Sequence, residues 1–120
     1  MSQSTTLILL PQTAYTAGPP ANTTVIGNAC HGASYYLSSQ DLQTVTWATT
    51  DFVGTITIQA SLVETPTTDS DWFTAFNVVY NSQGGTTINS FHNVTGNFIW
   101  IRAKINNFTL GTVEHIKVSY

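Results

Sequence analysis

The stretch Gly54–Leu62, GTITIQASL, alternates apolar and polar side chains with a period of two residues. Ile56, Ile58, Ala60 and Leu62 fall on one side of this period, and Thr55, Thr57, Gln59 and Ser61 fall on the other. Since successive side chains of a β-strand point to opposite faces, the stretch is predicted to be a strand with one buried and one solvated face. Such one-sided strands are typical of antiparallel sheets rather than of parallel sheets covered by helices.

Similar patterns recur along the chain, and about eight short strands are predicted at the spacing typical of all-β domains. The segments with strand character are 5–10, 23–26, 34–38, 41–48, 52–63, 72–80, 86–94, 98–105 and 112–120. Turns are predicted at Asp51, 81–85, 95–97 and 106–111, and the segments 11–22 and 64–71 are expected to be long loops, the second with a short helical turn. No window has the 3.6-residue period of an amphipathic helix. The sequence therefore predicts one all-β domain over 1–120, an antiparallel β-sandwich of the jelly-roll or Greek-key type.

Charged residues are unusually rare. They make up 8% of the chain, with a net charge of -3, against about 25% in ordinary domains. So few basic residues argue against binding to nucleic acid, whose phosphates need a basic surface. Because interface cores are depleted in charge, the composition favours a surface covered by neighbouring subunits. An extracellular or virion surface that relies on hydroxyl and amide groups for solubility is the alternative.

Cysteine content and hydropathy limit the cellular context. Cys30 is the only cysteine, which excludes an intrachain disulfide and a cysteine-based zinc site. No stretch approaches the roughly 20 apolar residues of a membrane helix, so no membrane partner is expected. The first residues lack the pattern of a signal peptide, and we expect synthesis in a cytoplasm.

The sequence predicts no catalytic residues, no cofactor and no metal. Its histidines and its cysteine are scattered, and they are interpreted as structural: Cys30, His31, His92 and His115. Three acidic residues gather near one loop, at Glu64, Asp69 and Asp71. They could ligate Ca²⁺ or act as a glycosidase pair, but their spacing matches no EF-hand and nothing fixes a carboxylate separation. A solvated acidic turn is the favoured interpretation.

Aromatic residues form the most informative set. Candidate interface or binding residues are Trp100, Phe98, Arg102, Trp72, Tyr35 and Tyr36. In the strand predicted at 98–105, Phe98, Trp100 and Arg102 share the face that the alternation leaves exposed. An exposed aromatic row beside cations indicates either a subunit interface or a stacking platform for sugar rings.

Four motifs resemble a family of short virion structural proteins of tailed phages, notably the contractile-tailed phages of marine cyanobacteria. They are F-x-G-T-I-T-I-Q-A-S-L from Phe52, P-x4-D-W-F from Pro66, GNFIWIRAK from Gly96 and F-T-x-G-T-V from Phe108. Together they cover roughly the last three-fifths of the chain, and the first fifty residues match no such pattern. The same strand pattern is also similar in architecture to discoidin-like sugar-binding jelly rolls.

The resemblance implies a structural role on a phage particle, without catalytic residues. We expect a capsid decoration subunit, or a neck, tail or fibre component, that contacts other virion proteins and assembles as a homo-oligomer. A trimer would match the threefold positions of a capsid lattice. The alternative is a carbohydrate-binding module for host surface glycans, which predicts Trp72 or Trp100 in a concave site open to solvent.

Overall fold

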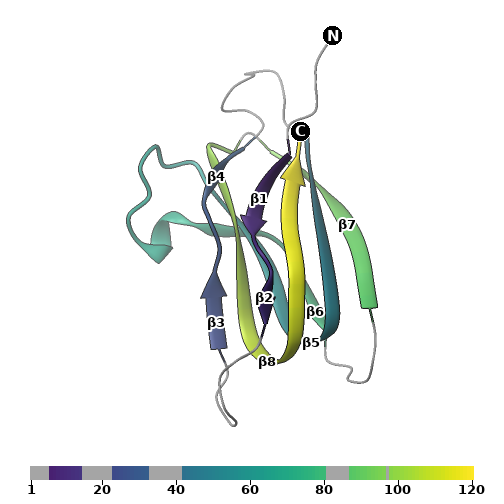
Figure 1. Ribbon diagram of the computed structural model, residues 1–120. Coiled ribbons are helices and arrows are strands. Elements are labelled where there is room, and N and C mark those ends of the chain that lie inside the picture. The colour runs from purple at the N-terminus through teal and green to yellow at the C-terminus, as the bar shows by residue number, and fades with distance from the viewer. Residues whose placement is uncertain (1–5, 15–22, 33–41, 81–86, 97) are drawn as a thin grey trace.

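A computed structural model describes residues 6–14, 23–32, 42–80, 87–96 and 98–120. Within them the chain forms one antiparallel sheet of eight strands (Figure 1). The strands are β1 (Thr6–Leu10), β2 (Thr13–Ala14), β3 (Thr23–Ile26), β4 (Cys30–His31), β5 (Leu42–Ser61), β6 (Phe73–Tyr80), β7 (Thr87–Thr95) and β8 (Trp100–Ser119). The predicted all-β antiparallel fold is confirmed, and the strand predicted at 34–38 lies outside the described residues.

Two long strands organise the sheet. β5 and β8 each span 20 residues and pair with each other along most of their length. The other edge of β8 pairs with β1, β2, β3 and β4, whereas the other edge of β5 pairs with β7 along its first half and with β6 along its second. The stretch Gly54–Leu62 therefore lies in the second half of β5, except for Leu62, which follows the end of the strand.

The central strands bend, so the two halves of the sheet face each other. Phe76 in β6 pairs with Ile58, which would lie about 36 Å from Trp47 if β5 were straight. Instead, the rings of Trp47 and Phe76 are 5.4 Å apart, and the indole Nε1 of Trp47 donates a hydrogen bond of 2.8 Å to the hydroxyl of Tyr80. The sheet thus folds over into a sandwich-like arrangement with an apolar interior.

Bulges produce the bends. Asp51 and Asn107 both have φ 54°, and Gly111 has φ 88°; the register between β5 and β8 shifts around these positions. The turns predicted at Asp51 and at 106–111 are therefore wrong, because the strands continue through them. Residues that tolerate positive φ serve a bulge as well as a turn, so composition alone does not separate the two.

The bulge at Asp51 keeps the apolar core on the same face of β5 along both halves of the strand. Gln43, Val45, Trp47 and Thr49 point inward before it, and alternate residues of the opposite parity point inward after it. Odd-numbered residues face the core before the bulge and even-numbered residues face it afterwards. The one extra residue of the bulge causes this change, and the alternation of apolar residues in the sequence shifts by one position there.

The core confirms the burial predicted for three of the four apolar residues in Gly54–Leu62. The prediction is wrong for Leu62, which is 60% exposed because β5 ends at Ser61. It is also wrong for Thr57 and Ser61, which are buried although they were expected on the solvated face. Ile56, Ile58 and Ala60 are each 0% exposed. They pack with residues from β8, β1 and β7, among them Ile101, Ala103, Ile105, Phe108, Ile116, Val118, Leu9 and Val94. No described helix is long and apolar enough to cross a membrane.

The segment between β5 and β6 projects from the sheet, on the left of Figure 1. The segment 64–71, predicted to be a loop, has no strand and contains one short 3-10 turn, η1 (Asp69–Asp71). The carboxylate of Asp71 accepts hydrogen bonds from the backbone N–H groups of Thr67 at 2.8 Å and Thr68 at 3.1 Å. In the loop predicted at 11–22, the structure places the short strand β2, and 15–22 lie outside the described residues.

Candidate binding site

The strand register brings the site together on the outer face of the sheet. His31 in β4 pairs with Trp100 in β8, which pairs in turn with Ser61 in β5. Two residues along β8, Arg102 pairs with Gln59 of β5. Since alternate residues of a strand share a face, Trp100 and Arg102 lie on the same side, opposite the buried face of β8.

Arg102 is held by three partners. Its Nε donates a hydrogen bond of 2.8 Å to Oε1 of Gln59, and its Nη2 lies 3.2 Å from Oδ1 of Asp69. The guanidinium carbon lies 4.2 Å from the ring centroid of Trp72, within the range of a cation–π interaction. The Arg102 side chain is only 11% exposed, whereas that of Asp69 is 75% exposed. A buried cation needs such compensation because desolvation disfavours its charge.

Further hydrogen bonds fix the projecting loop to the sheet. The Ser61 hydroxyl donates to the backbone carbonyl of Asp71 at 2.8 Å and accepts from the N–H of Val63 at 3.1 Å. The indole Nε1 of Trp100 donates to the backbone carbonyl of Glu64 at 2.9 Å. The N–H groups of Thr67 and Thr68 lower the pKa of the Asp71 carboxyl, because they stabilise its ionised form.

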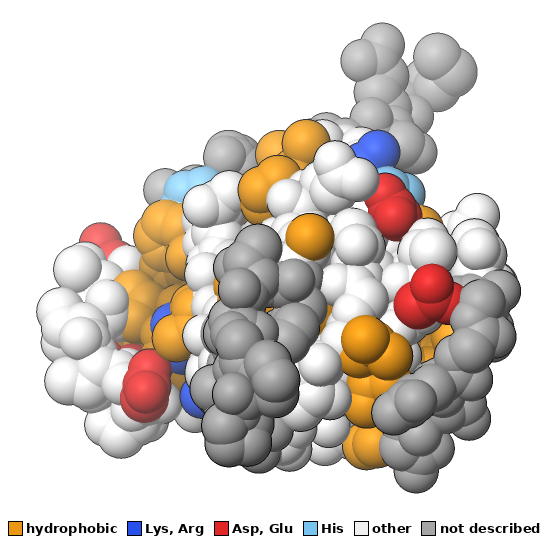
Figure 2. Space-filling view, turned by 60° about the horizontal axis from the view of Figure 1, so that its bottom comes forward, with side chains coloured by type: hydrophobic (Ala, Val, Ile, Leu, Met, Phe, Trp, Pro, Cys, Tyr) orange, Lys and Arg blue, Asp and Glu red, His pale blue; other side chains and the backbone are white. Residues whose placement is uncertain are grey.

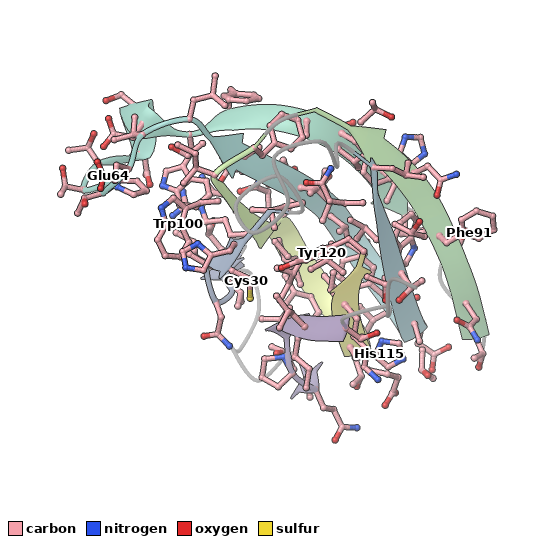
Figure 3. All side chains as sticks on the ribbon, turned by 90° about the horizontal axis from the view of Figure 1, so that it is seen from above. Cys30, Glu64, Phe91, Trp100, His115 and Tyr120 are labelled. Atoms are coloured by element: carbon pink, nitrogen blue, oxygen red, sulfur yellow. The ribbon has the colours of Figure 1, made fainter. Side chains whose placement is uncertain are left out.

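These contacts leave a hollow of about 360 Å³ between the loop and the sheet. Its lining residues are Ala29, Glu64, Thr65, Pro66, Thr67, Thr68, Asp69, Trp72, Trp100 and Arg102. Figure 3 shows Glu64 on the projecting loop and Trp100 close beside it. On the left of Figure 2, where this loop lies, hydrophobic, basic and acidic side chains meet. The volume is within the lower range of small-molecule sites, which combine aromatic walls with a few polar groups.

The structure brings together three of the six candidate residues from the sequence: Trp72, Trp100 and Arg102. Phe98 was predicted to share their exposed face, and this is wrong. It is 9% exposed and packs against Phe73 with ring centroids 5.6 Å apart. β8 begins at Trp100, so the strand alternation does not extend back to Phe98. Tyr35 and Tyr36 lie outside the described residues.

Sequence reasoning missed how the loop and the strand combine. From the sequence, Asp69 and Glu64 are recognisable only as members of an acidic cluster, and Gln59 only as a residue on the solvated side of a strand. The one signal in the sequence that could indicate these partners is Arg102. An arginine on a strand face near tryptophans needs an acidic or amide partner when it is buried. The loop threonines carried no signal, because threonine is common throughout this chain.

Other reactive side chains among the described residues include Cys30 and His31. Burial raises the pKa of the Cys30 thiol, so it is not activated as a nucleophile. The ring of His31 packs on Trp100 with centroids 4.1 Å apart. Among the described residues, no three metal-ligating side chains gather into a group that could hold an ion. The arrangement can stack a ring and exchange hydrogen bonds with it.

Comparisons with known proteins show likeness at the level of the fold only. No family model matches the sequence, and no curated protein matches it. The K1 cleaved adhesin domain of Lys-gingipain from Porphyromonas gingivalis W83 is similar with a TM-score of 0.48 and 7% identity, over 98% of each chain. The K2 cleaved adhesin domain of Lys-gingipain has a TM-score of 0.45 and 12% identity, over 98% of this chain and 86% of that one. At these scores the likeness carries no inference about function.

Proposed function

We propose that the chain is a carbohydrate-binding module whose site is the hollow beside Trp72 and Trp100. The single observation that supports this most strongly is the convergence of both tryptophans, a braced arginine and two acidic residues on one hollow. Sugar rings present apolar C–H faces that stack on aromatic rings, and their hydroxyls need hydrogen-bond partners of both kinds. Both tryptophans are partly exposed rather than buried, as a ligand-binding site requires.

The charge arrangement favours binding over hydrolysis. A glycosidase needs one carboxyl that remains protonated to act as the acid and a second that is ionised. The lowered pKa of Asp71 makes it unfit as that acid, and Asp69 is engaged by Arg102. Of the three carboxyls on the loop, this leaves only Glu64 for a pair that needs two. We therefore propose that bound saccharide leaves unchanged.

Saccharide binding can be tested by isothermal titration calorimetry with a panel of methyl glycosides and short oligosaccharides. Trp100→Ala is expected to weaken binding at least about tenfold, because an aromatic anchor contributes about 2 kcal/mol. Phe91→Ala is the matched control: Phe91 is 63% exposed and does not line the hollow. Equal affinity of the wild type and Trp100→Ala would contradict the proposed site.

A second candidate function is structural: a subunit of a phage particle, a capsid decoration protein or a neck, tail or fibre component, held by contacts with virion proteins or with copies of itself. Exposed hydrophobic residues on the outer face of the sheet, in β7 and β1, favour this function. Strand pairing sets Phe91, Thr46, Lys117 and Ile8 in one row across that face. Phe91 and Ile8 are 63% and 50% exposed, and Phe91 points away from the sheet in Figure 3.

The two functions are compatible, because a module on a virion can hold the particle with one face and a glycan with another. They differ in the variant that disrupts each. Phe91→Ser should reduce self-association or particle binding and leave saccharide affinity unchanged, whereas Trp100→Ala should do the reverse. Analytical ultracentrifugation of both variants measures self-association; if neither variant changes it, Phe91 is not an assembly contact between copies.

A further inference from the structure

We infer that the hollow selects uncharged saccharides and discriminates against acidic sugars such as uronic and sialic acids. This inference rests on the proposed function, since it names the ligand class of the same site. It follows from how the charges at the hollow are already compensated. Among the described residues that line it, Arg102 is the only basic one, and Glu64 and Asp69 are acidic.

The charge of the cation at the site is already compensated by other groups of the chain. Arg102 donates to Gln59 through Nε and contacts Asp69 through Nη2, and the ring of Trp72 covers its guanidinium. Proteins usually bind a sugar carboxylate through an arginine that offers a free pair of parallel N–H groups. Here such a ligand would have to compete with Asp69 for Nη2, beside a charge that Asp69 already compensates.

The rim of the hollow also repels negative charge. Glu64 is exposed, and the Asp69 side chain is 75% exposed. The lowered pKa of Asp71 keeps a third carboxylate ionised on the same loop at neutral pH. An acidic sugar would bring its own carboxylate close to these loop carboxylates. Like charges that meet without a counter-ion oppose binding.

The same groups suit a neutral sugar. An ionised carboxylate accepts hydrogen bonds and donates none. Glu64 and Asp69 therefore match the O–H donors of a saccharide. The threonine hydroxyls that line the hollow, on Thr65, Thr67 and Thr68, can donate or accept. Trp72 and Trp100 supply the apolar surface against the ring.

The test uses pairs of ligands that differ by one group. Methyl glucoside is compared with methyl glucuronide, and methyl galactoside with methyl galacturonide, by calorimetry on the full chain at neutral pH and low salt. We expect each neutral sugar that binds to bind at least about fivefold more tightly than its uronide, the ratio for one unscreened charge contact in water. Equal or tighter binding of the uronides would overturn the inference and leave the proposed function intact. Binding of no saccharide would overturn both.

Variants identify the source of the selectivity. Asp69→Asn removes the counter-ion of Arg102, so the ratio of neutral to acidic affinity should fall about fivefold. Glu64→Gln should lower the same ratio through the rim, and it changes an exposed side chain that leaves the ion pair in place. Glu114→Gln changes the net charge equally but does not line the hollow, and its ratio should match the wild type. If the ratio of neutral to acidic affinity is unchanged in both Asp69→Asn and Glu64→Gln, these charges are not the source of the selectivity.

Discussion

Arg102 connects the strand framework to the projecting loop, since it contacts Gln59 on β5, Asp69 in η1 and the ring of Trp72. Its side chain is largely buried although it lies on the outer face of the sheet, because the loop covers it. The sequence placed Arg102 and Trp100 on one strand face correctly. It did not predict that the loop returns over that face, because a loop's path depends on tertiary hydrogen bonds such as that from Ser61 to Asp71.

At the residue scale, Ile58→Ala should lower the free energy of unfolding by about 2–5 kcal/mol, the cost of a cavity at a fully buried aliphatic site. Ile58 is 0% exposed and lies in the middle of the second half of β5. Chemical denaturation measures the change. Val79→Ala, at a position that is 61% exposed, is the matched control and should change stability little. If the two variants are equally stable, Ile58 is not in the core.

At the scale of elements, the bulges of β5 and β8 decide the architecture. Alternation predicted most strands within a few residues, because the period of two is a local property of the sequence. Whether Asp51 and Asn107 interrupt a strand or bend it was not predictable, since both outcomes use left-handed backbone and the neighbouring strand decides between them. Two pairs of predicted strands are therefore each one continuous strand in the structure. The strands predicted at 41–48 and 52–63 form β5, and those predicted at 98–105 and 112–120 form β8.

Gly111→Ala tests the bend directly. Gly111 has φ 88°, and a Cβ there would lie 2.3 Å from the carbonyl oxygen of Asp51. We expect the substitution to destabilise the fold by about 1–3 kcal/mol through backbone strain and this clash. Asn107→Gly is the control on the same strand: glycine relieves the left-handed strain at φ 54°, and thermal unfolding should show no loss of comparable size. A Gly111→Ala protein as stable as the wild type would mean that the strand does not need this conformation.

The projecting loop should respond to acid through Asp71. The N–H groups of Thr67 and Thr68 lower its pKa in the folded chain, so the ionised carboxylate stabilises η1. That stabilisation is complete above the unfolded-state pKa of the carboxyl and is lost as the pH falls through the lowered folded-state pKa. Amide chemical shifts of Thr67 and Thr68 should report a transition in that acidic range, and Asp71→Asn should abolish it. A transition that persists in Asp71→Asn would assign the effect to another group.

At the scale of the whole molecule, the few charged residues are distributed unevenly over the surface. The outer face at β7, β5 and β8 carries mainly hydroxyl and amide side chains with Phe91 and Ile8 at its sides, whereas the loop side carries Glu64, Asp69 and Arg102 around the hollow. Composition indicated a surface suited to contacts, but it could not separate a face that meets a protein from a site that meets a ligand. Their separation requires the fold.

Quenching of tryptophan fluorescence by acrylamide shows whether the hollow beside Trp72 and Trp100 holds a saccharide. Trp47 is 3% exposed and lies in the core, so quenching reports mainly on Trp72 and Trp100. We predict that a saturating neutral saccharide lowers the quenching constant of the isolated chain close to that of the Trp72→Phe/Trp100→Phe variant, and that self-association alone leaves it unchanged. Quenching that no saccharide alters, but that falls when the chains assemble, would contradict the account and place both tryptophans in a subunit interface.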